Sequence, residues 1–310
     1  MTNDSADLDW THVSDPHAPA SHHLDDATPV LGTSTIAVPL ADVHRDPDTT
    51  SELVTQALLG TPAARLAVSA DGGWTCVRLP DYQGWVQTPA LGPEADPPVH
   101  AAPNDYVRVV ASRAVLQLEA EQWTVFAGSL LRRSGAEDET QLGVQLSDGR
   151  KGWIASAAVR PLLEHAGTKG DVAGVLATAH EYLTTPYLWG GMTVHGIDCS
   201  GFVQTVYRVH GYTIPRDADE QYAALPAEVE RGAWQPGDLL FYGSPPDGKP
   251  AAQWITHVGL YLGDGRVIHA SGRQDPASVV IQSTDPQAAD YAPRLVHTYI
   301  GARRIITQEK

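Results

Sequence analysis

Two stretches of the sequence repeat one another, and this repeat constrains the fold more than any other feature. Residues 76–91 read CVRLPDYQGWVQTPAL and residues 143–159 read GVQLSDGRKGWIASAAV, which places Trp153 opposite Trp85. Both copies alternate apolar and polar residues around Asp and Gly, as strands joined by tight turns do. The repeat therefore predicts two copies of one small β-barrel.

The chain divides into five segments. Its 310 residues exceed the length at which one hydrophobic core usually stops growing, so several compact domains are expected. Residues 1–32 are acidic and polar, as a disordered leader is, and residues 92–105 are rich in Pro and Ala, as a linker is. We expect barrels over 33–91 and 106–162 and a domain of another kind over 163–310.

The last segment places helix patterns before strand patterns. DVAGVLATAHEYLTT has apolar residues at helical spacing, and CSGFVQTVYRVHGY is a second predicted helix with Asp198 at its cap and Gly211 just past its end. Strand patterns follow in DLLFYG, THVGLYLGDGRVIHAS, SVVIQST and TYIGARRI, with Asp264 and Gly265 as a hairpin turn. Helices followed by an antiparallel sheet predict an α+β domain.

Cys199 is the candidate nucleophile. It opens the second predicted helix, where a thiol gains thiolate character, and Gly196 and Gly201 on either side allow close backbone approach. A lone cysteine beside small residues is more often a packed core thiol, so this position alone does not establish catalysis.

Two histidines strengthen the catalytic interpretation. His257 begins one strand and His269 follows across the predicted hairpin, so pairing of the two strands brings both imidazoles to one face. An isolated histidine could simply cap a strand, but two of them together with Cys199 favour a base and a group that orients it.

Residues 171–305 resemble the NlpC-type cell-wall cysteine peptidases, which have a papain-like fold. The motifs YLWGG, GIDCSGFV, a PR-containing loop followed by Gln, PGDLLFY, HVGLYLGDG and VIHASG occur in the family order. The resemblance implies Cys199 as nucleophile, His257 as general base and then acid, and His269 as its orienting residue. It also implies that Tyr187 forms an oxyanion hole with the backbone N–H of Cys199.

Both barrels resemble the bacterial SH3-like modules that are often attached to cell-wall enzymes. GW followed by an aliphatic residue carries this resemblance. The alternative is a pair of structural barrels with buried tryptophans. Residues 51–60, SELVTQALLG, interrupt the strand pattern of the first barrel, and we expect a helical turn or a wide loop there.

A finer resemblance concerns PRDADEQ, residues 215–221. Together with two preceding barrels it is similar to γ-D-glutamyl-L-diamino acid endopeptidases, in which the first barrel narrows the cleft and admits peptides with a free N-terminal L-Ala. An ammonium group in such a site needs a carboxylate partner. Ala218 departs from the Ser that is common there, which puts one hydrogen bond to substrate in doubt. The implied substrate-binding residues are Asp217, Tyr82, Asp198, Trp189, Ser200 and, as a possible second acid, Glu52.

Composition excludes several other classes. A formal charge of −16 repels nucleic acid and anionic membranes, and no stretch approaches the roughly 18 apolar residues of a membrane span. Cys76 and Cys199 lie in unrelated contexts, which fits a reducing compartment, and no secretion signal is visible, so we expect a cytoplasmic protein, with an exported form left open. We expect a monomer, but the sequence leaves the oligomeric state open. Histidines such as His22 and His23 lack metal-ligand spacing, so no metal or organic cofactor is expected.

The sequence therefore predicts a cysteine peptidase that cuts the γ-D-Glu–diamino acid bond of free peptidoglycan stem peptides during recycling. One alternative is an autolysin that cuts intact wall with the barrels as anchors. Another is a non-catalytic wall-binding protein. The identity of the diamino acid stays open.

Overall fold

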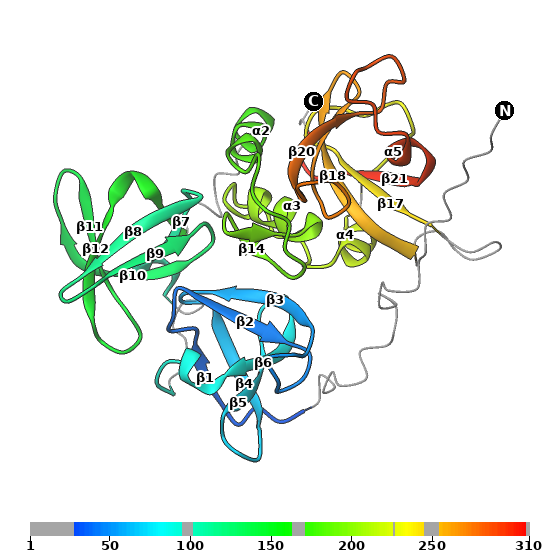
Figure 1. The fold of residues 1–310 in the computed structure, drawn as a ribbon. Coiled ribbons are helices and arrows are strands. Elements are labelled where there is room, and N and C mark those ends of the chain that lie inside the picture. Colours follow the sequence, from blue (N-terminus) through cyan, green and yellow to red (C-terminus); the bar gives the residue numbers. More distant parts are fainter. Residues whose placement is uncertain (1–27, 95–101, 163–170, 226, 245–253, 308–310) are drawn as a thin grey trace.

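The computed structural model describes residues 28–94, 102–162, 171–225, 227–244 and 254–307. Three β-rich bodies follow one another along the chain, the first two entirely sheet and the third with helices packed on its sheet (Figure 1). Most of the leader predicted over 1–32 and part of the linker predicted over 92–105 lie outside these residues.

The first body, barrel 1, is a six-stranded antiparallel sheet in the order β1-β4-β5-β6-β2-β3. Its elements are β1 (Gly32–Thr35), β2 (Leu40–His44), β3 (Leu53–Leu58), β4 (Pro62–Val68), β5 (Trp74–Arg78), β6 (Gln83–Gln87) and the 3-10 turn η1 (Thr88–Ala90). Ile36, Val43, Val77 and Val86 form the centre of its core. The helical turn or wide loop predicted over 51–60 is wrong, because Val54, Ala57 and Leu58 are buried as β3 pairs with β2.

The second body, barrel 2, is a seven-stranded antiparallel sheet in the order β13-β7-β10-β11-β12-β8-β9. Its elements are η2 (Pro103–Asp105), β7 (Tyr106–Val109), β8 (Arg113–Leu118), β9 (Gln122–Phe126), β10 (Leu130–Glu137), β11 (Gln141–Gln145), β12 (Lys151–Ala155), η3 (Ser156–Ala158) and β13 (Val159–Pro161). Val107, Leu116, Val144 and Ile154 lie in its core.

The repeat found in the sequence occupies the same register in both barrels. Cys76 pairs with Trp85 across β5 and β6, and Gly143 pairs with Trp153 across β11 and β12. The tryptophans are not buried as the structural alternative supposed: Trp85 is partly exposed and Trp153 is 38% exposed. The next residues along the strands, Val86 and Ile154, fill the cores instead, because alternate residues of a strand face opposite sides.

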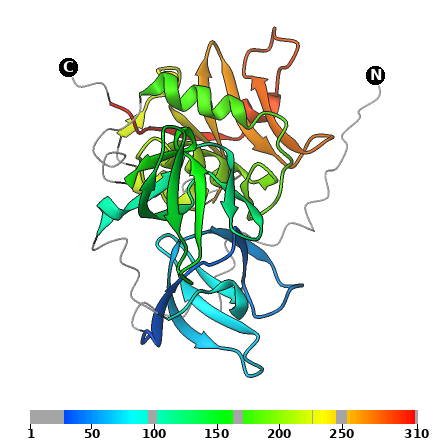
Figure 2. The ribbon, with the colours of Figure 1, turned by 90° about the vertical axis from the view of Figure 1, so that its left-hand side faces the viewer.

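The third body is built around a six-stranded sheet in the order β16-β21-β17-β18-β19-β20 (Figure 2). Three of its helices pack on one face of this sheet, and the last, short helix packs on the other. Its helices are α2 (Val172–Glu181), α3 (Cys199–Arg208), α4 (Ala218–Ala224) and α5 (Pro293–His297). Its strands are β16 (Ala227–Val229), β17 (Leu239–Gly243), β18 (Ile255–Gly263), β19 (Arg266–Ser271), β20 (Ser278–Ser283) and β21 (Tyr299–Arg304), besides a small hairpin of β14 (Met192–Thr193) and β15 (Gly196–Ile197). The sequence did not predict α4, α5, β16 or the β14–β15 hairpin.

Local signals explain where these elements begin and end. The Asp198 carboxylate accepts the N–H of Gly201 at 2.7 Å and so caps α3, while Gly211 beyond its end has a φ of 82°. Asp264 and Gly265 have φ values of 50° and 72°, the left-handed pair that a tight hairpin turn requires. The cap and the turn confirm the boundaries that the sequence predicted.

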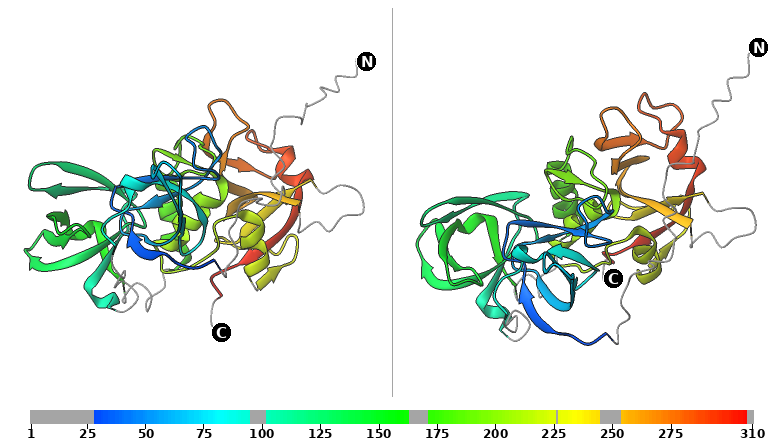
Figure 3. Two further views of the ribbon diagram at one scale, coloured as in Figure 1. Left: turned by 90° about the horizontal axis from the view of Figure 1, so that it is seen from below. Right: turned by 60° about the horizontal axis from the view of Figure 1, so that its bottom comes forward.

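Helix α3 lies at the centre of the molecule, between the sheet of the third body and the two barrels (Figures 1 and 3). Its apolar face packs on β18 and β19, where Phe202, Val203 and Val206 meet Val258 and Ile268 in one core. Within the part of the chain that the structure describes, the helices are all too short or too polar to cross a membrane.

Candidate active site

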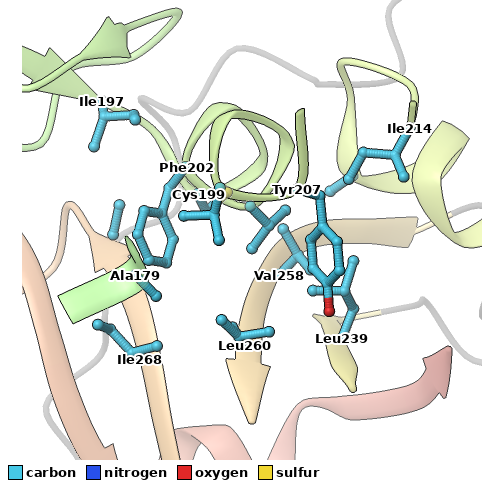
Figure 4. Close-up of a cluster of buried hydrophobic side chains, with 14 of the residues drawn as sticks. Ala179, Ile197, Cys199, Phe202, Tyr207, Ile214, Leu239, Val258, Leu260 and Ile268 are labelled. Atoms are coloured by element: carbon cyan, nitrogen blue, oxygen red, sulfur yellow. The ribbon is translucent and has the colours of Figure 1, made fainter. Parts of the chain in front are cut away.

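Cys199 lies at the first position of α3, at the edge of the main core, and is 8% exposed. Figure 4 shows its side chain beside Phe202 and above Val258 of β18. The backbone N–H groups of Val258 and Ser200 hydrogen-bond to the thiol. The sulfur is therefore fixed between the start of α3 and strand β18.

The surroundings of Cys199 keep its thiol protonated. Burial raises its pKa to about 12, and the adjacent Asp198 carboxylate adds to the rise, whereas the N–H of Val258 opposes it. A thiol of this pKa is neutral at pH 7, so it can attack only if a base removes its proton during the attack.

His257 and His269 supply that base and its support. Nε2 of His257 lies 2.8 Å from Nδ1 of His269, and Nε2 of His269 lies 2.9 Å from Oε1 of Gln282 on β20. The two imidazoles meet as the hairpin predicted, because β18 and β19 pair at Leu260 and Ile268. The three side chains form one hydrogen-bonded chain across three neighbouring strands.

Both imidazoles are held neutral. Burial foremost lowers the pKa of His257 well below its usual value, and the charge that a protonated His269 would carry and the cationic Arg294 and Arg273 act in the same direction. Burial lowers the pKa of His269 to about 4. A neutral imidazole can accept a proton, so His257 is a base in the resting state.

The backbone of His257 lies close to the sulfur. Val258, whose N–H bonds to the Cys199 thiol, directly follows His257 on β18. The hydrogen bond to His269 uses Nε2 of His257, so Nδ1 is the ring nitrogen that remains available to take a proton. The ring also stands against that of Tyr242, with centroids 5.7 Å apart, a neighbour that sequence reasoning missed although it belongs to PGDLLFY.

Tyr187 lies close to the thiol, as predicted. Burial raises the pKa of its hydroxyl, and the negative charges of Cys199 and Asp198 would raise it further. Its backbone bridges Ile197, just before the nucleophile, and its ring fills the space that a side chain at Gly272 would need. A phenol that stays protonated beside the reacting sulfur can donate to a developing oxyanion.

Asp198 and Ser200, which the sequence assigned to substrate binding, are buried and bonded to Arg216, and their contact with a substrate stays a prediction. Asp198 is 6% exposed, and its two oxygens accept Arg216 Nη1 at 3.0 Å and Nη2 at 2.6 Å. Ser200 Oγ accepts Arg216 Nη1 at 2.8 Å. Both side chains therefore hold the first turn of α3, and with it Cys199, in place.

Arg216 is the functional residue that sequence reasoning overlooked. It is 1% exposed and, besides Asp198 and Ser200, its Nε donates to Thr55 Oγ1 of barrel 1 at 2.9 Å. A buried guanidinium needs this full set of acceptors. The PR motif marked the position in the sequence, but only the fold shows that its partners come from two domains.

Asp217 and Tyr82 meet across the domain boundary, as the resemblance implied. The Tyr82 hydroxyl of barrel 1 hydrogen-bonds to the Asp217 carboxylate, and Arg216 Nη1 lies 4.0 Å from the same carboxylate. Partial burial raises the pKa of Asp217 to about 6, opposed by Arg216 and reinforced by Glu220. Its side chain stays 40% exposed, so the carboxylate is open to a ligand and ionised at pH 7.

Glu52 and Trp189 form a second contact across this boundary. Trp189, which is 48% exposed, donates from Nε1 to Glu52 Oε1 at 2.9 Å, and Arg45 Nε donates to Oε2 at 2.8 Å. Gly190 next to Trp189 has a φ of 74°, and a Cβ there would lie 2.5 Å from the carbonyl oxygen of Leu53. The backbone of barrel 1 at Leu53 thus packs directly against the backbone of the YLWGG loop, and Glu52 lies beside this contact.

Over the described ranges, no group of three or more His, Cys, Asp or Glu side chains is arranged to hold a metal ion. Cys76 and Cys199 are both free thiols. The chemistry available from these residues is thiol attack with imidazole as proton carrier.

A cysteine at the start of a helix that packs on an antiparallel sheet carrying a histidine pair defines a papain-like cysteine peptidase domain. The model of the NlpC/P60 family matches residues 184–295, which include Cys199, His257 and His269. The model of the bacterial dipeptidyl-peptidase SH3 domain matches residues 43–91. The chain belongs to the NlpC/P60 family and is a peptidase with an N-terminal SH3 domain.

Relatives and a solved structure agree with this family. The chain is 31% identical over 231 residues to a γ-D-glutamyl-L-lysine dipeptidyl-peptidase of Bacillus subtilis, which covers 72% of this chain and 73% of the relative. It is 30% identical over 247 residues to dipeptidyl-peptidase 6 of Lysinibacillus sphaericus, covering 75% and 85%. A crystal structure of an NlpC/P60 family protein from Bacillus cereus matches with a TM-score of 0.74 and 25% identity, covering 88% of this chain and 99% of that one.

The SH3 model covers most of the first barrel predicted over 33–91. For residues 106–162 the SH3-like assignment stays a prediction, which the shared strand register of the two barrels supports.

Proposed function

We propose that this peptidase hydrolyses the bond between γ-D-Glu and a diamino acid in free peptidoglycan stem peptides that carry an unblocked N-terminal L-Ala. The products are the L-Ala-D-Glu dipeptide and the remaining peptide or diamino acid. The observation that carries the proposal is the Asp217–Tyr82 pair, which stands beside the cysteine helix at the junction with barrel 1. The names of two relatives, γ-D-glutamyl-L-lysine dipeptidyl-peptidase and dipeptidyl-peptidase 6, support the same bond and the same product length.

Asp217 suits the N-terminal ammonium of such a peptide. Arg216 is its nearest cation, but the guanidinium is already bonded to Asp198 at 2.6 Å and only approaches Asp217 to 4.0 Å. An ammonium leaving water needs a carboxylate partner, and Tyr82 adds a polar group at the same point. Blocking the amine by acetylation removes the charge that this site would bind.

The reaction is an acyl transfer through a thioester. The Cys199 thiol passes its proton to Nδ1 of His257 as sulfur attacks the γ-carbonyl carbon of D-Glu, and the oxyanion accepts hydrogen bonds from Tyr187 and the N–H of Cys199. His257 then gives the proton to the departing amine as the C–N bond breaks. Water, deprotonated by His257, attacks the thioester, and the released dipeptide leaves the thiol restored.

We further propose that the enzyme acts as a cytoplasmic monomer on small peptides, without nucleic acid, membrane or cofactor. The negative charge and the sequence context of the two cysteines support this setting. The task that follows is recycling of peptides released from the wall.

Mass spectrometry of cleavage products tests the proposal. L-Ala-γ-D-Glu-L-Lys and its meso-diaminopimelate analogue are incubated beside the same peptides acetylated at the N-terminus. We expect L-Ala-D-Glu from the free peptides and no turnover of the acetylated ones. Equal rates on free and blocked peptides would refute amine recognition.

Two controls assign the activity to the site. Cys199→Ala removes hydrolysis, while Cys76→Ala, which deletes the other buried free thiol, leaves it unchanged. Hydrolysis retained by Cys199→Ala refutes the nucleophile. Purified sacculi form a third arm, because efficient cutting of intact wall would favour the autolysin over the recycling enzyme.

A further inference from the structure

The hydrogen-bonded chain behind His257 ends on an amide oxygen. Oε1 of Gln282 lies 2.9 Å from Nε2 of His269, and Nδ1 of His269 lies 2.8 Å from Nε2 of His257. Gln282 comes from β20, and its backbone pairs with Val267 rather than with either histidine. The side chain therefore reaches the pair from the neighbouring strand, and the motifs of the sequence did not mark it.

An amide oxygen can only accept a hydrogen bond, and this fixes every proton along the chain. Nε2 of His269 must carry its hydrogen in order to donate to Gln282. A neutral imidazole has a single N–H, so Nδ1 of His269 is an acceptor. Nε2 of His257 must then be the donor of the next bond, which leaves a lone pair on Nδ1 of His257.

The arrangement matters because both rings are neutral. His269 is 3% exposed, and Arg273 and Arg294 are the cations that disfavour a charged His257. An imidazolium would carry hydrogens on both nitrogens and need no selection between them. A neutral ring has two tautomers, and only one of them can take a proton at Nδ1.

We propose that Gln282 is a positioning residue that sets the tautomers of His269 and His257 and so keeps Nδ1 of His257 free to take the proton of Cys199. The inference rests on the proposed roles of Cys199 and His257. It differs from orientation by a carboxylate, because a neutral amide selects the tautomer without attracting a positive charge onto the rings.

Replacing Gln282 by an apolar side chain removes the acceptor that selects one tautomer of His269, so both tautomers should then be populated. In Gln282→Leu we expect kcat to fall about 10- to 100-fold, the effect that outer partners of functional imidazoles commonly have, with little change in KM. Imidazole ¹⁵N NMR should show the Nε2–H tautomer of both histidines in the wild type and a mixture in the variant.

A carboxylate should restore what leucine removes. Gln282→Glu keeps an acceptor at the same place, so kcat at neutral pH returns towards the wild-type value. Its charge favours the imidazolium, so the acid limb of the pH profile moves to higher pH. Gln274→Leu is the matched control: it removes an amide that bonds to Ser278 instead of a histidine, and we expect kcat unchanged.

The rate of Cys199 alkylation by iodoacetamide at pH 7 separates this inference from the proposed substrate. The rate should fall in Gln282→Leu and recover in Gln282→Glu even if the chosen peptides are not substrates. Wild-type alkylation and turnover in Gln282→Leu would overturn the inference. If that variant does not fold, an Nδ1–H tautomer of His257 in the wild-type NMR spectrum would overturn it equally.

Discussion

The two barrels share a strand register but meet the peptidase domain in different ways. Barrel 1 contacts residues close to Cys199 as well as the end of α3 and the β14–β15 hairpin. Barrel 2 contacts the end of α3, where Arg108 donates to the carbonyl of Arg208 at 3.1 Å, and the β14–β15 turn, where Phe126 meets His195 edge to face. The contacts of barrel 1 are Thr55 with Arg216, Glu52 with Trp189, Gln56 with Met192, Asp81 with Gln204 and Arg208, and Tyr82 with Asp217.

Equivalent turns make the difference clear. Asp81 precedes the GW strand of barrel 1, and its Oδ2 accepts Gln204 at 2.9 Å and Arg208 at 2.7 Å on α3. Asp148 holds the corresponding place in barrel 2, but it bonds Arg150 of its own turn at 2.7 Å. The turn of barrel 1 thus bonds to the cysteine helix, whereas the equivalent turn of barrel 2 bonds only within itself in these contacts.

Loss of the Asp217 charge is the sharpest way to break this comparison. In Asp217→Asn we expect kcat/KM for the free-amine peptide to fall roughly 10- to 100-fold, since a hydrogen bond to a charged group contributes about 1.5–3 kcal/mol. Steady-state kinetics measure the loss. Glu228→Gln is the control, because it removes an exposed carboxylate on β16, at the edge of the sheet, and should change nothing.

The pH profile tests the same contact without a mutation. The pKa of Asp217 is raised to about 6, so the carboxylate is ionised above this value and neutral below it. We expect kcat/KM to drop roughly fivefold between pH 6 and pH 5, because kcat/KM reports ionisation of the free enzyme. In Asp217→Asn this limb should be lost. A limb near pH 6 that persists in the variant contradicts the assignment.

The hydrogen bond that Arg216 donates to Thr55 tests whether barrel 1 stabilises the fold around Cys199. Thr55→Val leaves a buried donor unpaired and should lower the free energy of unfolding by about 1–3 kcal/mol, with a smaller loss of kcat. Ser129→Ala in barrel 2 is the matched control. The Ser129 hydroxyl is buried without a hydrogen-bond partner among the described residues, so thermal unfolding should be unchanged or shifted slightly upward.

The smallest effect is expected at the turn that carries Tyr82. Asp81→Asn weakens a partly exposed ion pair, with side chains 27% and 24% exposed, that contributes about 0.2–1 kcal/mol. We expect KM to rise about two- to fivefold at unchanged kcat, since the turn loosens while Cys199 does not. Asp148→Asn should leave both constants unchanged. Equal effects of the two variants would remove the distinction between the barrels.

Sequence patterns predicted the elements that obey local rules. Asp198 and the hairpin turn at Asp264 and Gly265 fixed the start of α3 and the pairing of β18 with β19, and that pairing brought His257 to His269. The predicted loop over 51–60 failed because β3 is defined by its pairing with β2, which no local pattern encodes. The short helices α4 and α5 were missed because five to seven residues are too few to show a helical period in the sequence.

Contacts between residues far apart in the sequence were beyond the reach of sequence patterns. Motif position does not reveal burial, and only the fold shows Asp198 and Ser200 bonded to Arg216. The reach of Gln282 to His269 depends on the neighbouring strand and carries no local signature. Cys199 could be proposed as the nucleophile because its place at the start of a helix and the hairpin that pairs His257 with His269 are both local signals.

Asp81 and Tyr82 are neighbours in a single short turn, one fastened to the cysteine helix and the other to Asp217. The residue that holds the turn to α3 and the residue that bonds to Asp217 therefore lie on one short segment, which contains none of the proposed reacting groups. Under the proposed function, exchanging that turn between homologous enzymes would change the hydroxyl that Tyr82 adds at the peptide's first residue, while Asp217, the thiol and the imidazoles remain those of the recipient. This short segment can therefore vary, in nature or by design, while the residues proposed to cleave the bond stay unchanged.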